Sequence, residues 1–153
     1  METECKTNLK RFGVVVVEDS KSDARLIVEG LQHDGRNLSI LLLTDGEKAS
    51  NHFKDIEEVS FVSRDKLDLI LLDLNLPKKS GFELIGEIRA IPVLTNVPVV
   101  VFSGAPRADE VWHCYDLGAN LVVRKPHEVE PFLNLIKAIE HYCLDVHAGA
   151  SPA

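Results

Sequence analysis

The chain has 153 residues, of which 45% are hydrophobic and 27% charged, and its formal net charge is −7. Such a composition is typical of one globular domain, long enough to bury roughly two thirds of its unfolded surface. An acidic chain without a stripe of lysine and arginine is not expected to bind nucleic acid, and no apolar run has the length of a signal or membrane-spanning helix.

Short aliphatic runs separated by helical patterns recur along the chain. They predict buried parallel strands at residues 14–17, 40–43, 69–72, 99–102 and 121–123. Helices are expected over 20–33, over 46–56, from Phe82 to before Pro92, over 106–118, and over a last stretch that uses residues 132–139 and Tyr142. Residues 57–67 are polar and fit either a loop or an extension of the second helix. Strands that alternate with helices predict an α/β fold, a doubly wound sheet with helices on both faces.

The chain shows no internal repeat, linker or second domain. We expect an N-terminal extension at residues 1–11, one domain over 12–146 and a flexible tail at 147–153. The cysteines, Cys5, Cys114 and Cys143, are odd in number and form no close pair, which indicates reduced thiols. The sequence therefore predicts a cytoplasmic protein.

Four polar residues stand at the carboxyl ends of predicted strands: Asp19, Asp73, Ser103 and Lys125. Because the carboxyl ends of parallel strands meet at one crevice, we expect these side chains to converge. Each has an ordinary explanation by itself, as a helix cap, a turn residue or a surface amine. Their joint occurrence at different strand ends favours a phosphoryl and Mg²⁺ site instead.

Mg²⁺ takes oxygen ligands from a few carboxylates and keeps several waters. Asp19 and Asp73 would supply two ligands, Glu18 would hold a water, and the backbone carbonyl of Asn75 would supply another oxygen. A carboxylate beside a metal is also a possible nucleophile, which Asp73 would provide.

A transferred phosphoryl group needs its three oxygens compensated. The cation would take one, the ammonium of Lys125 a second, and the hydroxyl of Ser103 with nearby backbone N–H groups the third.

The sequences VVVVED ending at Asp19, LLDLNLPKKSG around Asp73, VFSG around Ser103 and RKP around Lys125 resemble those of response-regulator receiver domains of two-component signalling. The resemblance covers residues 12–144, and Ser103 and Lys125 follow Asp73 by 30 (103 − 73) and 52 (125 − 73) residues, as in that family. It implies a flavodoxin-like fold with five strands in the order 2-1-3-4-5.

The resemblance also implies that Asp73 accepts a phosphoryl group from a sensor histidine kinase and that Asp19 binds Mg²⁺ directly, with Glu18 assisting. Lys125 would contact the phosphoryl group, Ser103 would move toward it, and the Lys125–Pro126 peptide would be cis, as is common in the family.

Two features depart from compact receivers. Asp73 follows Asp19 by 54 residues (73 − 19), a lengthened interval with the excess near 57–67, and this resembles stand-alone regulators of the phytochrome-associated type. Val122 occupies the position where many receivers carry a switching aromatic residue. We expect Tyr115 to lie near Val122 and to supply an apolar contact in its place.

Tyr115 would belong to the surface of the fourth helix, fifth strand and fifth helix, through which a homodimer would form. Trp112, in contrast, is expected to pack in the core or at its rim, and Lys78 and Lys79 to be a solvated pair.

No DNA-binding or enzymatic output domain is visible, so we expect a non-enzyme that acts through protein contacts. It would act on a downstream protein, relay phosphate to a histidine-containing phosphotransfer protein, or drain phosphate from a kinase.

Three other functions fit the sequence less well. A phosphatase of the haloacid dehalogenase type needs an acid where Asn75 stands, and flavin phosphate would be repelled by Glu18 and Asp19. A silent scaffold does not explain why every active-site position is occupied.

Overall fold

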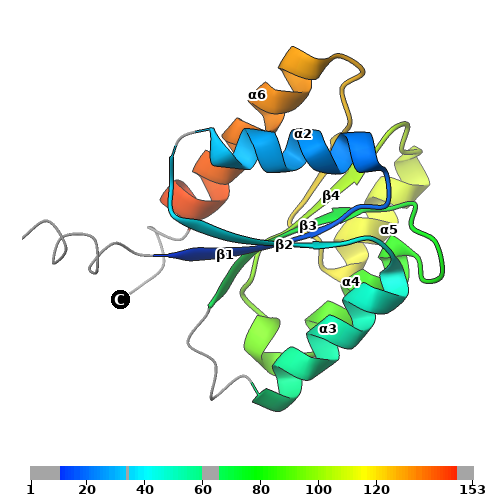
Figure 1. Cartoon of the computed structure of the whole chain (residues 1–153). Coiled ribbons are helices and arrows are strands. Elements are labelled where there is room, and N and C mark those ends of the chain that lie inside the picture. Colours follow the sequence, from blue (N-terminus) through cyan, green and yellow to red (C-terminus); the bar gives the residue numbers. More distant parts are fainter. Residues whose placement is uncertain (1–10, 34, 60–65, 148–153) are drawn as a thin grey trace, which may run out of the picture.

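The structure, a computed structural model, describes residues 11–33, 35–59 and 66–147. Its centre is a parallel sheet of five strands in the order β2-β1-β3-β4-β5, as predicted (Figure 1). The strands are β1 (Phe12–Val17), β2 (Leu38–Leu43), β3 (Leu67–Asp73), β4 (Val99–Ser103) and β5 (Leu121–Arg124).

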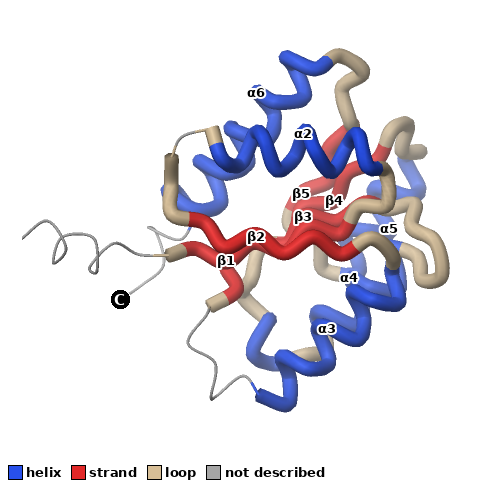
Figure 2. The backbone as a smooth tube through the Cα atoms, in the orientation of Figure 1, coloured by secondary structure: helices blue, strands red, loops and turns tan. Residues whose placement is uncertain are grey.

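Helices cover both faces of the sheet (Figure 2). They are α2 (Lys21–Gln32), α3 (Gly46–Val59), α4 (Gly81–Arg89), α5 (Ala108–Leu117) and α6 (Val129–Glu140), with a short 3₁₀ helix η1 (Pro92–Leu94) and a π-helical segment η2 (His141–His147). Helices α2 and α6 lie on one face, and α3, α4 and α5 lie on the other (Figure 1). The described helices include none that is long and apolar enough to cross a membrane.

The sheet has a hydrophobic core on each face. Val14 and Val16 of β1 join the core under α2 and α6, whereas Val15 and Val17 join the core under α3, α4 and α5. Because both faces are covered, the strands read as continuous aliphatic runs rather than as alternating patterns. This architecture confirms the flavodoxin-like fold class.

The helix boundaries differ from the predicted ones at three places. Helix α3 continues to Val59, so part of the polar stretch extends the helix, and residues 60–65 lie outside the described part of the chain. Helix α5 begins at Ala108 rather than at Pro106, with Arg107 as its N-cap. Tyr142, which was expected among the apolar residues of the last helix, instead lies in η2 and is 56% exposed.

Two helix ends follow the sequence signals for caps. Ser20 caps α2 by accepting the backbone N–H of Asp23 at 3.3 Å, and Gly118 ends α5 with φ of 114°, in the left-handed region that glycine favours. Residues 148–153 and 1–10 lie outside the described residues, so the predicted extension and tail stay predictions.

Candidate functional site

The polar residues at the strand ends do meet at one edge of the sheet. Glu18 and Asp19 follow β1, Asp73 ends β3, and Ser103 ends β4. Lys125 follows β5 directly, and its backbone N–H donates to the carbonyl of Ser103 at 2.9 Å. The convergence predicted from the strand pattern is therefore present in the structure.

An acidic cluster occupies this edge. Carboxylate oxygens of Glu18, Asp19 and Asp73 all lie within 4.8 Å of one another, and in the described part of the chain no other such group of potential metal ligands occurs. Glu18 is 1% exposed and Asp73 6%, whereas Asp19 is open to solvent. Two buried carboxylates beside a third carboxylate form an environment that a divalent cation would neutralise.

The protonation of Glu18 reflects this crowding. Burial raises its pKa, the hydrogen bond to Asp73 raises it further, and Lys125 offsets this only in part, so that the pKa is about 7. Oε1 of Glu18 lies 2.8 Å from Lys125 Nζ, a close ion pair, yet no described donor points at this oxygen in hydrogen-bond geometry. The buried carboxylate is thus incompletely compensated by the protein itself.

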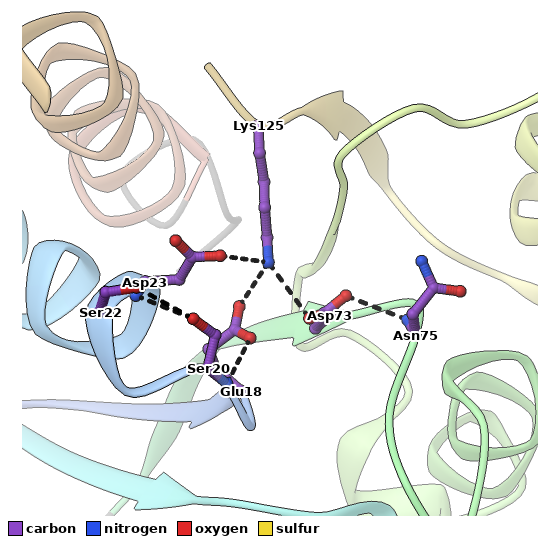
Figure 3. A network of polar contacts seen from close by, with 7 residues as sticks. All are labelled: Glu18, Ser20, Ser22, Asp23, Asp73, Asn75 and Lys125. Atoms are coloured by element: carbon purple, nitrogen blue, oxygen red, sulfur yellow. Dashed lines mark hydrogen bonds and ion pairs between the residues drawn. The ribbon is translucent and has the colours of Figure 1, made fainter. Parts of the chain in front are cut away.

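Lys125 is the cation of the site (Figure 3). Its Nζ lies 2.8 Å from Glu18 Oε1, 2.8 Å from Asp23 Oδ2 and 3.1 Å from Asp73 Oδ2. Burial lowers the pKa of this ammonium, but the hydrogen bond to Asp23 and the negative charges of Glu18 and Asp73 raise it overall. Lys125 therefore stays protonated among the carboxylates.

Sequence reasoning missed Asp23 as a member of this group. Its side chain turns toward Lys125 from the first turn of α2 (Figure 3). The available signal was its spacing: an acid one helical turn after Asp19, at the end of α2 that faces the strand ends, points toward the same crevice.

The carboxylate of Asp73 is held from both sides. Oδ1 accepts the backbone N–H of Asn75 at 3.0 Å, and Oδ2 faces Lys125 (Figure 3). The loop itself is anchored, because the Leu74 N–H donates to the Phe102 carbonyl at 3.0 Å and the Gly81 N–H donates to the Leu74 carbonyl at 3.0 Å. Asp73 is consequently presented in a defined orientation at the end of β3.

Ser103 and the Lys125–Pro126 peptide complete the edge. Ser103 is buried, with 2% of its surface exposed, at the end of β4. The expectation of a cis Lys125–Pro126 peptide is wrong, since the described residues contain no cis peptide bond. The backbone N–H of Lys125 pairs with the Ser103 carbonyl, and its Nζ lies 3.1 Å from Asp73 Oδ2.

Lys78 and Lys79 do not form a solvated pair. Lys78 is exposed and adopts φ of 72°, but Lys79 forms an ion pair with Glu87 and lies 3.1 Å from the hydroxyl of Ser50. The expectation is wrong for Lys79 because the Ser50 hydroxyl on α3 donates to Glu87 Oε1 on α4 at 2.6 Å, and the Lys79 ammonium joins this pair.

The aromatic residues of α5 also differ from expectation. Tyr115 does lie beside Val122, and its hydroxyl accepts the Val122 N–H at 3.1 Å, so the contact seen in the structure is a polar one. Trp112 is 69% exposed, and the prediction that it packs in the core or at its rim is wrong. It precedes the buried Cys114 by two positions, which places it on the opposite side of the helix.

The sequence is similar to those of known proteins. Residues 14–137 match the family model of the response regulator receiver domain. Response regulator Rcp1 of Synechocystis sp. is 33% identical over 132 residues, which cover 86% of this chain and 88% of Rcp1.

Solved structures agree with this match. The phosphorylated cyanobacterial phytochrome response regulator RcpA has a TM-score of 0.80 at 37% identity, covering 89% of this chain and 96% of RcpA. The Mn²⁺-bound form of Rcp1 has a TM-score of 0.77 at 34% identity, covering 88% of this chain and 95% of Rcp1. Sequence match, strand order and acidic edge together show that the chain belongs to the response regulator receiver domain family of two-component signalling.

Proposed function

We propose that this receiver domain accepts a phosphoryl group on Asp73 from a sensor histidine kinase, with Mg²⁺ bound at the same edge. The observation that carries the proposal is the setting of Asp73. One of its oxygens is held by the Asn75 N–H, the other faces the Lys125 ammonium, and Glu18 and Asp19 stand beside it. A nucleophilic carboxylate next to a cation and a potential metal site is what phosphoryl transfer requires.

In the proposed step, a carboxylate oxygen of Asp73 attacks the phosphorus of a phosphohistidine. The new O–P bond forms as the N–P bond breaks, and the electron pair of that bond stays on the imidazole, which takes up a proton. The Lys125 ammonium compensates negative charge on one phosphoryl oxygen, and the Ser103 hydroxyl donates a hydrogen bond to another. Lys125 is already within 3.1 Å of Asp73, so it needs little displacement.

The residues present fit a divalent cation. The three clustered carboxylates are hard oxygen donors, and the incompletely compensated Glu18 Oε1 marks a local excess of negative charge. We propose that Asp19 and Asp73 bind the cation directly, that Glu18 acts through a water, and that the Asn75 carbonyl adds a ligand. When bound, the cation supplies a Lewis acid that neutralises phosphoryl charge.

Mn²⁺ binding by the related Rcp1 supports a divalent cation at this position.

Output would occur through a protein surface that responds to the phosphoryl group through Ser103 and Lys125. The surface of α5, β5 and α6, which are the fourth helix, fifth strand and fifth helix of the sequence-based prediction, is the proposed homodimer contact. The exposed Trp112 and the half-exposed Tyr115 support it. Sedimentation velocity of the wild type and Tyr115→Ala tests it, since a monomer in both would contradict the dimer.

The partners proposed are the kinase and either a downstream protein or a histidine-containing phosphotransfer protein. An effector, a relay intermediate and a phosphate sink all begin with the same phosphorylation of Asp73. We propose no catalytic turnover on other substrates, because Asn75 lacks the acid–base group that an aspartyl phosphatase would need at that position. A cytoplasmic location, where such kinases present their phosphohistidine, stays a prediction.

The test is intact-protein mass after incubation with acetyl phosphate and Mg²⁺. We expect one added phosphoryl group in the wild type and none in Asp73→Asn. The group should be retained in Asp116→Asn, which removes an exposed carboxylate near the C-terminal end of α5 and outside the acidic cluster. Omission of the cation should prevent the adduct. An adduct that persists in Asp73→Asn would move the acceptor to another residue and overturn the assignment.

A further inference from the structure

The ammonium of Lys125 is fully engaged in the structure. An ammonium has three N–H donors, and Nζ contacts three carboxylates, those of Glu18, Asp23 and Asp73, at 2.8, 2.8 and 3.1 Å (Figure 3). The Lys125 side chain is only 13% exposed, so water cannot readily replace a carboxylate that is withdrawn from it. Each carboxylate that remains in contact with Lys125 therefore lowers the free-energy penalty of withdrawing another one from it.

The three carboxylates do not belong to the same group. Glu18 and Asp73 form the acidic cluster with Asp19, whereas Asp23 is not a member of that cluster or of any other ligand group in the described ranges. A divalent cation bound at the cluster would draw on the carboxylates of Glu18 and Asp73 that now compensate Lys125. Lys125 and the cation thus compete for two acids, and Asp23 is the carboxylate outside that competition.

The start of α2 fixes Asp23 in this position. The Ser20 hydroxyl accepts the Asp23 N–H at 3.3 Å, and the Ser20 N–H donates to Glu18 Oε2 at 3.1 Å. One capping residue therefore orients both an acid of the cluster and the acid outside it. Asp23 is 29% exposed at its side chain and reaches Lys125 from the helix rather than from the sheet edge.

We propose that Asp23 is a positioning residue that keeps Lys125 paired while Glu18 and Asp73 turn to a bound divalent cation. This inference rests on the proposed function of the same site and adds a residue to it. Asp23 retains the ammonium near Asp73 and lowers the free-energy penalty of withdrawing the other two carboxylates from it. Without Asp23, Lys125 would hold Glu18 and Asp73 more strongly, and the cation would bind less tightly.

The experiment is calorimetric titration of Mn²⁺ into the unphosphorylated protein at physiological ionic strength. Asp23→Asn keeps the size of the side chain and removes its charge, and we expect it to weaken Mn²⁺ binding about tenfold, in the range of one charge-assisted hydrogen bond. The matched control is Glu29→Gln, which removes an exposed charge from the same helix and should change the affinity less than about twofold.

A double-mutant cycle separates positioning from simple charge. Lys125→Met removes the ammonium, so we expect tighter Mn²⁺ binding in this variant than in the wild type. In the Lys125→Met background, Asp23→Asn should then weaken Mn²⁺ binding no more than Glu29→Gln does. An equal loss from Asp23→Asn in both backgrounds would overturn the positioning role, because Asp23 would then act by its own charge or as a ligand.

Folding is checked by circular dichroism of every variant. If Asp23→Asn fails to fold, Asp23→Ser, which suits the first turn of a helix, is used in its place with the same expected result. A wild type that binds Mn²⁺ and accepts phosphate while Asp23→Asn binds Mn²⁺ equally well overturns only the role of Asp23. A wild type that neither binds Mn²⁺ nor accepts phosphate overturns the proposed function itself.

Discussion

The two edges of the sheet each bury a glutamate, and they compensate it in different ways. At the amino ends of the strands, Glu140 is fully buried, and its Oε2 accepts a hydrogen bond from Arg36 Nε at 2.7 Å. The same guanidinium donates two hydrogen bonds to the carboxylate of Asp145, at 2.5 and 2.6 Å, and lies 5.5 Å from the centre of the Phe12 ring. Charge, planar geometry and aromatic contact all favour this arrangement.

At the carboxyl ends, Glu18 shares a single ammonium with Asp23 and Asp73, and Asp19 stands beside them. Lys125 is a point charge without the bidentate fork of Arg36. The comparison shows that the fold can neutralise a buried acid well where it serves structure. At the edge where the carboxyl ends of the strands converge, it leaves an excess of negative charge that a divalent cation would neutralise.

The two edges also respond to pH in opposite directions. The hydrogen bond from Arg36 lowers the pKa of Asp145 to about 2, so its stabilisation is present above the ordinary value near 3.8 and is lost as the pH falls toward 2. Burial raises the pKa of Glu18 to about 7, so the folded state prefers the protonated form. The contribution of Glu18 to the free energy of unfolding is greatest below pH 4.5 and is lost as the pH rises through 7.

The largest expected effect concerns the amino-end edge. Arg36→Met should lower the free energy of unfolding by about 3–4 kcal/mol, because the buried Glu140 loses its arginine partner. Urea denaturation measures the loss, and Mn²⁺ affinity should be unchanged. The control is Arg107→Met, which removes a guanidinium that is 73% exposed and should change stability by less than about 1 kcal/mol. If Arg36→Met lowered the free energy of unfolding as little as Arg107→Met does, the claim that Arg36 compensates a buried acid at the amino ends would be contradicted.

The second effect concerns the other edge. A divalent cation at about 100 times its Kd should raise the free energy of unfolding by about 2.7 kcal/mol. We expect the same increment in the wild type and in Arg36→Met, since distant sites are additive, and no increment in Asp19→Asn. Thermal melts with Mg²⁺ or with chelator measure it. Loss of the increment in Arg36→Met would mean that the two edges are coupled.

A smaller effect tests the excess of negative charge directly. In cation-free buffer, Glu18→Gln mimics the protonated acid, so its stability relative to the wild type should rise between pH 5 and pH 8, by about 2 kcal/mol. Urea titrations at several pH values measure this difference. A difference independent of pH would contradict the raised pKa of Glu18.

The smallest effect lies away from both edges. Tyr115→Phe removes the hydroxyl that accepts the Val122 N–H and should lower stability by about 1 kcal/mol. The rate of phosphorylation by acetyl phosphate and the Mn²⁺ affinity should stay at wild-type values. A slower phosphorylation would show that this polar contact influences the site at the strand ends.

Much of this molecule follows from local sequence patterns. Aliphatic runs such as 14–17 and 69–72 predict strands buried on both faces, and the helical patterns between them predict parallel crossovers, as the structure has them. Once the strands are parallel, Asp19, Asp73, Ser103 and Lys125 must gather at one edge, because each follows or ends a strand. Strand order came from the resemblance to receiver domains rather than from the patterns.

Other features were decided only by the tertiary structure. The side of α5 that packs inward left Trp112 in solvent, and the approach of α3 to α4 left the Lys79–Glu87 ion pair only partly exposed. The Arg36–Glu140 ion pair joins residues 104 positions apart. Asp23 became a partner of Lys125 across 102 positions. A sequence pattern shows which face of an element is apolar, but which polar groups meet depends on how those faces are oriented after packing.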